Sequence, residues 1–266
     1  MPAHSRLPTL LPPIIVTVLV IAGLVHGPIE QLADYHAFAD HSVLFGIPHA
    51  CDVFSNLGFA LVAVWGLLRR PTGGDGEAGY RLFLVGLLMT AFGSTYYHLA
   101  PDDARLVWDR VPIALACAGL LAGVRGDALQ RDSRTATGWL ALFAVGSVAW
   151  WYWTAREGRG DLRPYLLLQI LPLLLIPLWQ AIGKTSGNER LAFASALLLY
   201  ALAKWAELND HAIAAVTAPL TGHTLKHLLA TAAATVIAAA LVRRRRDATN
   251  STRRRRVVSP PPACPS

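Results

Sequence analysis

The chain has 266 residues, of which 54% are hydrophobic and 15% charged, and its formal net charge is +7. Because ordinary soluble domains carry about 25% charged residues, this composition excludes a typical soluble fold and favours a membrane protein. The positive charge does not indicate nucleic-acid binding, since much of it lies in two arginine runs, 243–246 and 253–256, outside the apolar segments. Basic residues beside a membrane helix more often fix its orientation and contact anionic lipid.

The first apolar run extends from Leu10 to Val25 and follows Arg6, so in length it resembles a signal peptide. No clear Ala-x-Ala cleavage site follows it near residues 26–28, and we therefore expect an uncleaved first helix. Residues 28–48 mix polar and apolar side chains and predict an extramembrane loop or a short interfacial helix. Residues 1–47 are thus interpreted as an N-terminal hydrophobic segment with an outer loop.

Seven further apolar segments follow, and each approaches the length of about 17–25 residues that a helix needs to cross a membrane. They are Cys51–Leu68, Tyr80–Leu99, Leu106–Val124, Thr137–Trp153, Leu162–Ile182, Leu191–Trp205 and Gly222–Val242. The pattern predicts an all-α membrane protein, a seven-helix transmembrane bundle over residues 48–242 with an additional N-terminal hydrophobic helix. The remaining residues, 243–266, are rich in Arg, Ser and Pro and predict a disordered basic tail.

The charges in the connecting loops predict the orientation. If the N-terminus is cytoplasmic and the helices alternate, most basic loop residues and the tail fall on the cytoplasmic side, as the positive-inside rule requires. The residues on that side are Arg69, Arg70, Arg81, Arg125, Arg131, Arg134, Lys184 and Arg190. The alanine- and arginine-rich composition is typical of bacteria, so we expect a bacterial inner-membrane protein with a cytoplasmic C-terminus.

Under the same alternation, the polar residues inside the apolar segments all fall toward the outer ends of their helices. They are Asp52, Ser55, Asn56, Ser94, His98, Asp109, Arg110, Lys204, Glu207, Asp210, His223 and His227. Ionisable residues within a membrane are costly and usually functional. Their common depth predicts one site near the outer face of the membrane.

Three histidines are the candidate metal ligands. His223 and His227 are four residues apart, which puts both imidazoles on one face of a helix, where they can share a metal ion or simply cap the helix end. His98, from another segment, supplies a third imidazole, although a lone histidine at that position is also compatible with an interfacial role. Three neutral histidines and a water make a catalytic zinc site, whereas a structural zinc would have four protein ligands.

Two more residues are candidates for catalysis. Ser94, one turn from His98, is suited to donate to a developing oxyanion, although it could also bond its own helix. Asp109 follows a short turn after His98 and is suited to orient a ligand or hold a water as general base, with a plain ion pair to Arg110 as the alternative. A supporting polar cluster, as compatible with a satisfied charge cluster as with catalysis, comprises Lys204, Glu207, Asp210 and Asn56.

The pattern Ser94-x3-His98-x10-Asp109, followed far downstream by His223-x3-His227, resembles the alkaline ceramidase family. That family belongs to a superfamily of seven-helix membrane hydrolases that includes the adiponectin receptors and hemolysin III-type proteins. The motif Asp52-Val-Phe-Ser-Asn-Leu and the spacing Lys204-x2-Glu207-x2-Asp210 also look ceramidase-like. The resemblance covers residues 48–242.

The resemblance implies a zinc-dependent amidase that hydrolyses the amide bond of ceramide, or of a related lipid, to a sphingoid-type amine and a fatty acid. It implies that His98, His223 and His227 bind the zinc, that Asp109 handles the water proton and that Ser94 assists at the oxyanion. The chain departs from the eukaryotic enzymes at their acidic calcium site, where it offers Asp40 and places His49 at an expected acid, which speaks against calcium. The alternative function is a non-catalytic membrane receptor or transporter with a zinc site.

Overall fold

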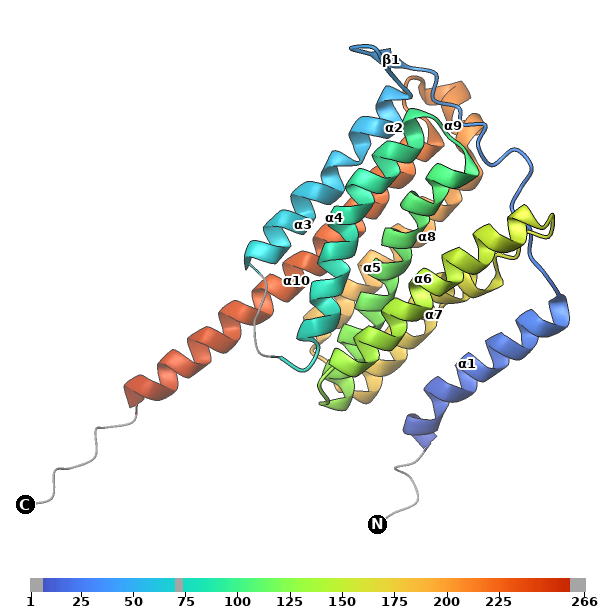
Figure 1. Ribbon diagram of the computed structural model, residues 1–266. Helices are drawn as coiled ribbons and strands as arrows, with labels where there is room; N and C mark the ends of the chain where they lie inside the picture. Colours follow the sequence, from blue (N-terminus) through green and yellow to red (C-terminus); the bar gives the residue numbers. More distant parts are fainter. Residues whose placement is uncertain (1–6, 70–73, 259–266) are drawn as a thin grey trace, which may run out of the picture.

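A computed structural model describes residues 7–69 and 74–258 of the chain, and side chains are described for residues 10–69 and 74–244. The helices are α1 (Leu7–His26), α2 (Ala50–Ser55), α3 (Leu57–Arg69), α4 (Glu77–Leu99), α5 (Asp103–Leu129), α6 (Arg134–Arg156), α7 (Arg163–Ile182), α8 (Gly187–Leu208), α9 (Asp210–Thr217) and α10 (Gly222–Val258). A small antiparallel hairpin pairs β1 (Val43–Leu44) with β2 (Ile47–Pro48) at one end of the helical bundle (Figure 1).

Every apolar segment expected to cross the membrane is helical, so the predicted all-α membrane bundle is confirmed. Within the described residues, six helical spans are long and apolar enough to cross a membrane. They are Ala50–Arg69, Glu77–Leu99, Asp103–Leu129, Arg163–Ile182, Gly187–Leu208 and Gly222–Arg244. Helix α6 is also long, at 23 residues, but it is less apolar because of its tryptophan, tyrosine and hydroxyl side chains. The apolar helix Leu10–His26 is shorter.

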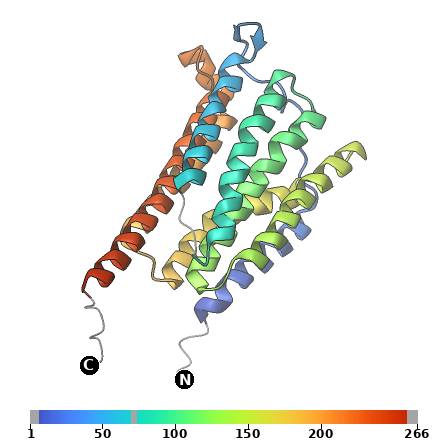
Figure 2. The same cartoon turned by 60° about the vertical axis from the view of Figure 1, so that its left-hand side comes forward.

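The two ends of the bundle differ in what they carry. The hairpin, α2 and α9 lie at one end, and the start of α1 and the far end of α10 lie at the other (Figures 1 and 2). Helix α1 lies at the edge of the bundle against α7, while α10 packs against α8 and α3. The end of α4 and the start of α10, which carry the candidate histidines, therefore meet at the hairpin end.

Close packing of α4 on α5 brings the polar end of α4, with Ser94 and His98, next to the polar start of α5, with Asp109. Glycines recur every seven residues along the face of α4 that meets α5, at Gly79, Gly86 and Gly93. A Cβ added at Gly79 would lie 2.2 Å from the backbone nitrogen of Gly123, and one at Gly93 would lie 1.9 Å from the carbonyl oxygen of Trp108. Small residues let membrane helices approach this closely, which brings the candidate residues of α4 and α5 side by side.

Two elements outside the spans differ from the expectation. The segment 28–48, expected as a loop or a short interfacial helix, contains the β1–β2 hairpin, and the connection between α8 and α10 contains the helix α9. Neither has the long apolar periodicity by which the spans are recognised.

Residues 243–258 continue α10 as helix, although their composition predicts a disordered tail. Arginine and alanine favour helix, and elongation of an existing helix is easier than nucleation of a new one. Residues 259–266 lie outside the described part of the chain, and the division of the chain into three regions stays a prediction.

Candidate metal centre

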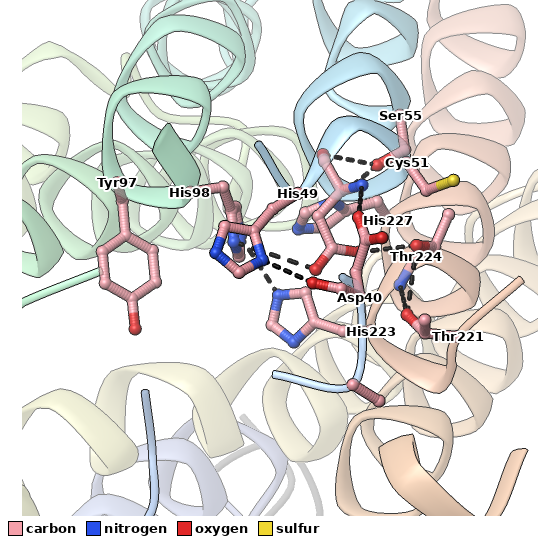
Figure 3. Close-up of polar contacts among 12 residues, drawn as sticks. Asp40, His49, Cys51, Ser55, Tyr97, His98, Thr221, His223, Thr224 and His227 are labelled. Carbon is pink, nitrogen blue, oxygen red and sulfur yellow. Dashed lines mark hydrogen bonds and ion pairs between the residues drawn. The ribbon is translucent and has the colours of Figure 1, made fainter. Parts of the chain in front are cut away.

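The three candidate histidines lie together at the hairpin end of the bundle (Figure 3). His98 comes from the last turn of α4, and His223 and His227 come from the first turns of α10. One ligand atom from each imidazole lies within 4.8 Å of those of the other two. All three side chains are buried, with exposed fractions of 0%, 3% and 2% in chain order. This buried group of three histidines could hold a metal ion.

The nitrogen spacing fits a shared ion. The Nε2 atoms of His98 and His223 are 3.2 Å apart. Two nitrogens bound to one tetrahedral zinc at about 2.0–2.1 Å lie about 3.3–3.4 Å apart, so the two rings already stand at nearly the spacing of two ligands. Both imidazoles are neutral donors of the kind that zinc takes in its three-histidine sites.

Ser55 determines which nitrogen of His227 is free to bind. The Ser55 hydroxyl donates to the backbone carbonyl of Asp52 at 2.7 Å, and the Ser55 oxygen also lies 2.7 Å from Nδ1 of His227. Because the single hydroxyl proton goes to the carbonyl, Nδ1 of His227 carries the proton and donates to Ser55. The lone pair of that imidazole is therefore on Nε2, which is available to a metal.

Asp52, on α2, links this helix to the two helices that carry the histidines. Its Oδ1 accepts a hydrogen bond from Thr224 at 2.6 Å, and its Oδ2 lies 4.0 Å from Nδ1 of His98. Its backbone nitrogen donates to the carboxylate of Asp40 at 2.9 Å, which fixes the start of α2 to the preceding loop. The side chain of Asp52 thus contacts α10 through Thr224 and faces His98 of α4, and these are the two helices that carry the histidines.

The loop before α2 covers the histidines at the end of the bundle. The ring of Phe38 packs edge-on against those of His98 and His223, with centroid distances of 4.8 and 4.4 Å. Next to it, the backbone nitrogen of Ala39 donates to Asp210 at 2.9 Å. The candidate centre is therefore covered on this side by an aromatic ring, and His227 faces the interior of the bundle.

That interior holds a cavity of about 160 Å³, and His227 is part of its wall. Ser94 and Asp109 line the same cavity, and the Ser94 hydroxyl faces the Asp109 carboxyl. Both side chains are buried, and Oδ1 of Asp109 has no hydrogen-bond partner within the described residues. Of the five residues assigned to the site from the sequence, Ser94, Asp109 and His227 line this cavity, and His98 and His223 group with His227 at its edge.

Arg110 does not pair with Asp109 within the described part of the chain. Its guanidinium carbon lies 4.0 Å from the ring centroid of Trp151 and 5.0 Å from that of Tyr35, a cation–π arrangement. The alternative of a plain ion pair between neighbouring residues is therefore not what the geometry supports.

The supporting polar residues divide into separate groups. Lys204 and Glu207 form an ion pair at 2.9 Å, and Lys226 of α10 joins them by an ion pair to Glu207 at 2.8 Å. Asp210 instead accepts the backbone nitrogen of His223 at 2.7 Å and so stabilises the start of α10. Asn56 lies at the junction of α2 and α3, where its amide donates to the carbonyl of Asp52 at 2.9 Å.

Two residues next to the candidate metal centre, Lys226 and Phe38, were not recognised as part of it from the sequence. Lys226 stands between the two histidines of α10, and its Nζ lies 3.1 Å from Nε2 of His223. Its spacing of three residues after His223 is a signal that could have identified it. Phe38 lies in a segment without periodicity, and nothing in the sequence around it indicates that it covers the site.

Comparison of the sequence with protein-family models finds no matching family, and comparison with characterised proteins finds no match either. The fold and the site define a helical protein of the multi-pass membrane class with a buried three-histidine group that could bind a metal ion.

Proposed function

We propose that the protein is a zinc-dependent integral membrane amidase that hydrolyses the N-acyl amide bond of a lipid such as ceramide. The observation that carries this proposal is a buried group of three histidines, one of which, His227, lines the same cavity as Ser94 and Asp109. The resemblance of these five residues to the alkaline ceramidase pattern supports the same reaction. It also makes ceramide the first substrate to test.

His98, His223 and His227 would hold the zinc ion. Three imidazole ligands leave one tetrahedral position open, which is the arrangement of catalytic rather than structural zinc sites. A zinc ion bound there supplies a nucleophile at neutral pH by acidifying a water, and it polarises the carbonyl group to be attacked.

Asp109 is suited to transfer a proton from the attacking water to the departing amine. Its carboxylate is buried, faces the cavity and keeps one oxygen without a partner within the described residues, so it can accept a proton from the attacking water. The same carboxylic acid can then protonate the departing amine. Ser94, beside it, can donate a hydrogen bond to the carbonyl oxygen as negative charge develops on it.

The rest of the cavity is suited to a hydrocarbon chain. Beyond the polar end, its wall is formed by apolar side chains from α4, α5 and α10, including Phe83, Leu87, Leu120 and Ile237. Because this part of the wall is apolar, an acyl chain could fill it without breaking a hydrogen bond, and it would exclude water from the reacting groups. The cavity thus accounts for both parts of a lipid amide.

The charge distribution supports an orientation with the site toward the outer face of a bacterial inner membrane. The ends of α3, α5 and α7 and the starts of α4, α6 and α8 meet at the end of the bundle opposite the histidines (Figure 1). Among the described residues, the basic loop residues assigned to the cytoplasm lie at or near these helix ends, including Arg69, Arg131 and Lys184. The positive-inside rule assigns that end to the cytoplasm.

The proposal is tested with purified full-length protein and a panel of lipid amides that includes ceramide. Activity should disappear when the metal is removed with a chelator and return when zinc is added. Metal binding without hydrolysis of any amide in the panel would contradict the amidase and favour a receptor or transporter with a zinc site.

A further inference from the structure

A partly buried cluster of two lysines and one glutamate lies next to the candidate metal centre. Each oxygen of the Glu207 carboxylate is engaged by a different ammonium group, Oε1 by Lys226 at 2.8 Å and Oε2 by Lys204 at 2.9 Å. All three side chains line the same cavity as Ser94 and Asp109. The cluster is therefore within the space that a substrate would occupy.

The cluster carries more positive charge and more hydrogen-bond donors than its own carboxylate can use. Two ammonium groups and one carboxylate leave a net charge of +1, and each ammonium group has three N–H donors. Asp109 forms no ion pair with either lysine within the described residues. The Asp109 carboxylate in the same cavity offsets part of this charge at a distance, but it leaves N–H donors of both ammonium groups unused, and these donors favour a second anionic group in the cavity.

Lys226 also points toward the position of the reaction. Its Nζ lies 3.1 Å from Nε2 of His223. That nitrogen cannot accept a hydrogen bond and bind a metal with the same lone pair, so metal binding frees an N–H donor of Lys226. Lys204 is the most accessible member of the cluster, with 43% of its side chain exposed against 14% for Lys226.

We propose that Lys204 and Lys226 bind a carboxylate on the amine side of the substrate, and that the substrates are N-acylated amino acids. The inference rests on the proposed amidase function and specifies its substrate class. An acyl chain would lie in the apolar part of the cavity, the amide at the three histidines and the carboxylate, a few bonds from the amide nitrogen, at the two lysines. Hydrolysis breaks the amide C–N bond, with the water adding a hydroxyl to the acyl carbon and a proton to the nitrogen. The products are a fatty acid and a free amino acid.

Ceramide does not use this cluster in the same way. It is a neutral amide and offers only hydroxyl groups to the lysines, whereas a carboxylate accepts charge-assisted hydrogen bonds from both of them. Loss of one such hydrogen bond reduces the affinity or kcat/KM by roughly 10- to 100-fold.

The first experiment compares N-palmitoyl glycine, its methyl ester and ceramide as substrates of the zinc-loaded protein. We expect the acid to be hydrolysed with a kcat/KM roughly 10- to 100-fold above that of the ester. In the variant Lys204→Met, the kcat/KM for the acid should fall toward that of the ester. The kcat/KM for the ester should change little, because the ester has no carboxylate for Lys204 to bind. This variant leaves Glu207 paired with Lys226, which favours correct folding. Lys184→Met, an exposed lysine at the opposite end of the bundle, is the matched control and should keep the preference.

The second experiment measures binding without catalysis. N-palmitoyl glycine and its methyl ester are titrated into the chelator-treated protein, where we expect the acid to bind more tightly than the ester in the wild type but not in Lys204→Met. Anion-selective binding without any hydrolysis would overturn the amidase and leave the anion site in place. Equal hydrolysis and equal binding of acid and ester would overturn the anion site and leave the amidase.

Discussion

The Oδ2 atom of Asp52 lies 4.0 Å from Nδ1 of His98, and neither atom has a hydrogen-bond partner within the described residues. Both side chains are fully buried, at 0% exposure. Buried polar atoms without partners are rare and call for an explanation. Metal-binding histidines commonly donate their second ring nitrogen to a carboxylate, and Asp52 stands where it can accept that bond from His98.

Asp52→Asn should weaken metal binding by roughly 10- to 100-fold, the usual effect of losing a carboxylate behind a histidine ligand. The asparagine keeps an acceptor for Thr224, so the helix packing should remain intact. The measurement is metal affinity in competition with a chelator of known strength. Asp132→Asn, at an exposed position in the α5–α6 turn, is the control. An unchanged affinity in Asp52→Asn would remove Asp52 from the support of the site.

The protein should bind about one zinc ion per chain, because the three histidines form one group. Elemental analysis of purified protein measures this directly. His223→Ala and His227→Ala should each lose the metal, since two ligands hold zinc far more weakly than three. His41→Ala, an exposed histidine in the preceding loop, should retain it. Full zinc retention in both helix variants would be incompatible with the assigned ligands.

Gly79→Ala should destabilise the fold by about 1–3 kcal/mol, the range typical of overpacking. The added Cβ would meet the backbone of α5 at 2.2 Å, and backbone cannot move aside as a flexible side chain can. Gly138→Ala on α6 is the control, because a Cβ there meets nothing within 4 Å. Thermal unfolding in detergent should separate the two variants, and equal unfolding temperatures would show that α4 and α5 can separate without cost.

A topology reporter fused after Ser266 should be active on the cytoplasmic side. The arginines that follow the last span would otherwise have to cross the membrane, which the positive-inside rule disfavours. The control is the same reporter inserted in the turn between α6 and α7, at the end of the bundle that carries the histidines. The opposite result for both fusions would place the candidate site on the inner face.

The membrane spans could be predicted from the sequence because each is a long apolar segment, a signal that does not depend on neighbouring helices. The grouping of His98 with His223 and His227 was predicted for a related reason. Alternation of the helices assigns each polar residue a depth in the membrane. The depth predicted for Ser94 and Asp109 is the same as that predicted for the three histidines.

The partners of individual side chains could not be predicted, because they depend on which helices touch. Lys226 pairs with Glu207 only because α8 packs against α10. Asp210, expected in the same cluster, instead bonds the start of α10, since the turn of α9 brings its carboxylate to His223. Depth along a helix is visible in a sequence, whereas rotation about its axis relative to a neighbour is a property of packing.

The last prediction distinguishes catalysis from metal binding at Asp109. Asp109→Asn keeps the shape of the side chain but cannot take a proton, so it should fold, retain zinc and lose roughly 10²- to 10⁴-fold in turnover, the usual contribution of general acid–base catalysis. Ser94→Ala should also retain zinc and lose about 10²- to 10³-fold if it is one oxyanion donor.

Single-turnover hydrolysis and zinc content, measured on the same preparations, test both variants. Because Oδ1 of Asp109 has no partner within the described residues, the asparagine should disturb few existing bonds, and a loss of rate then reports on the proton. Loss of zinc together with activity in Asp109→Asn would make Asp109 part of the metal support, and the base would have to be sought at Asp102 or Asp103. Turnover at the wild-type rate would exclude Asp109 as the base, because no step that depends on its ionisation could then limit the reaction.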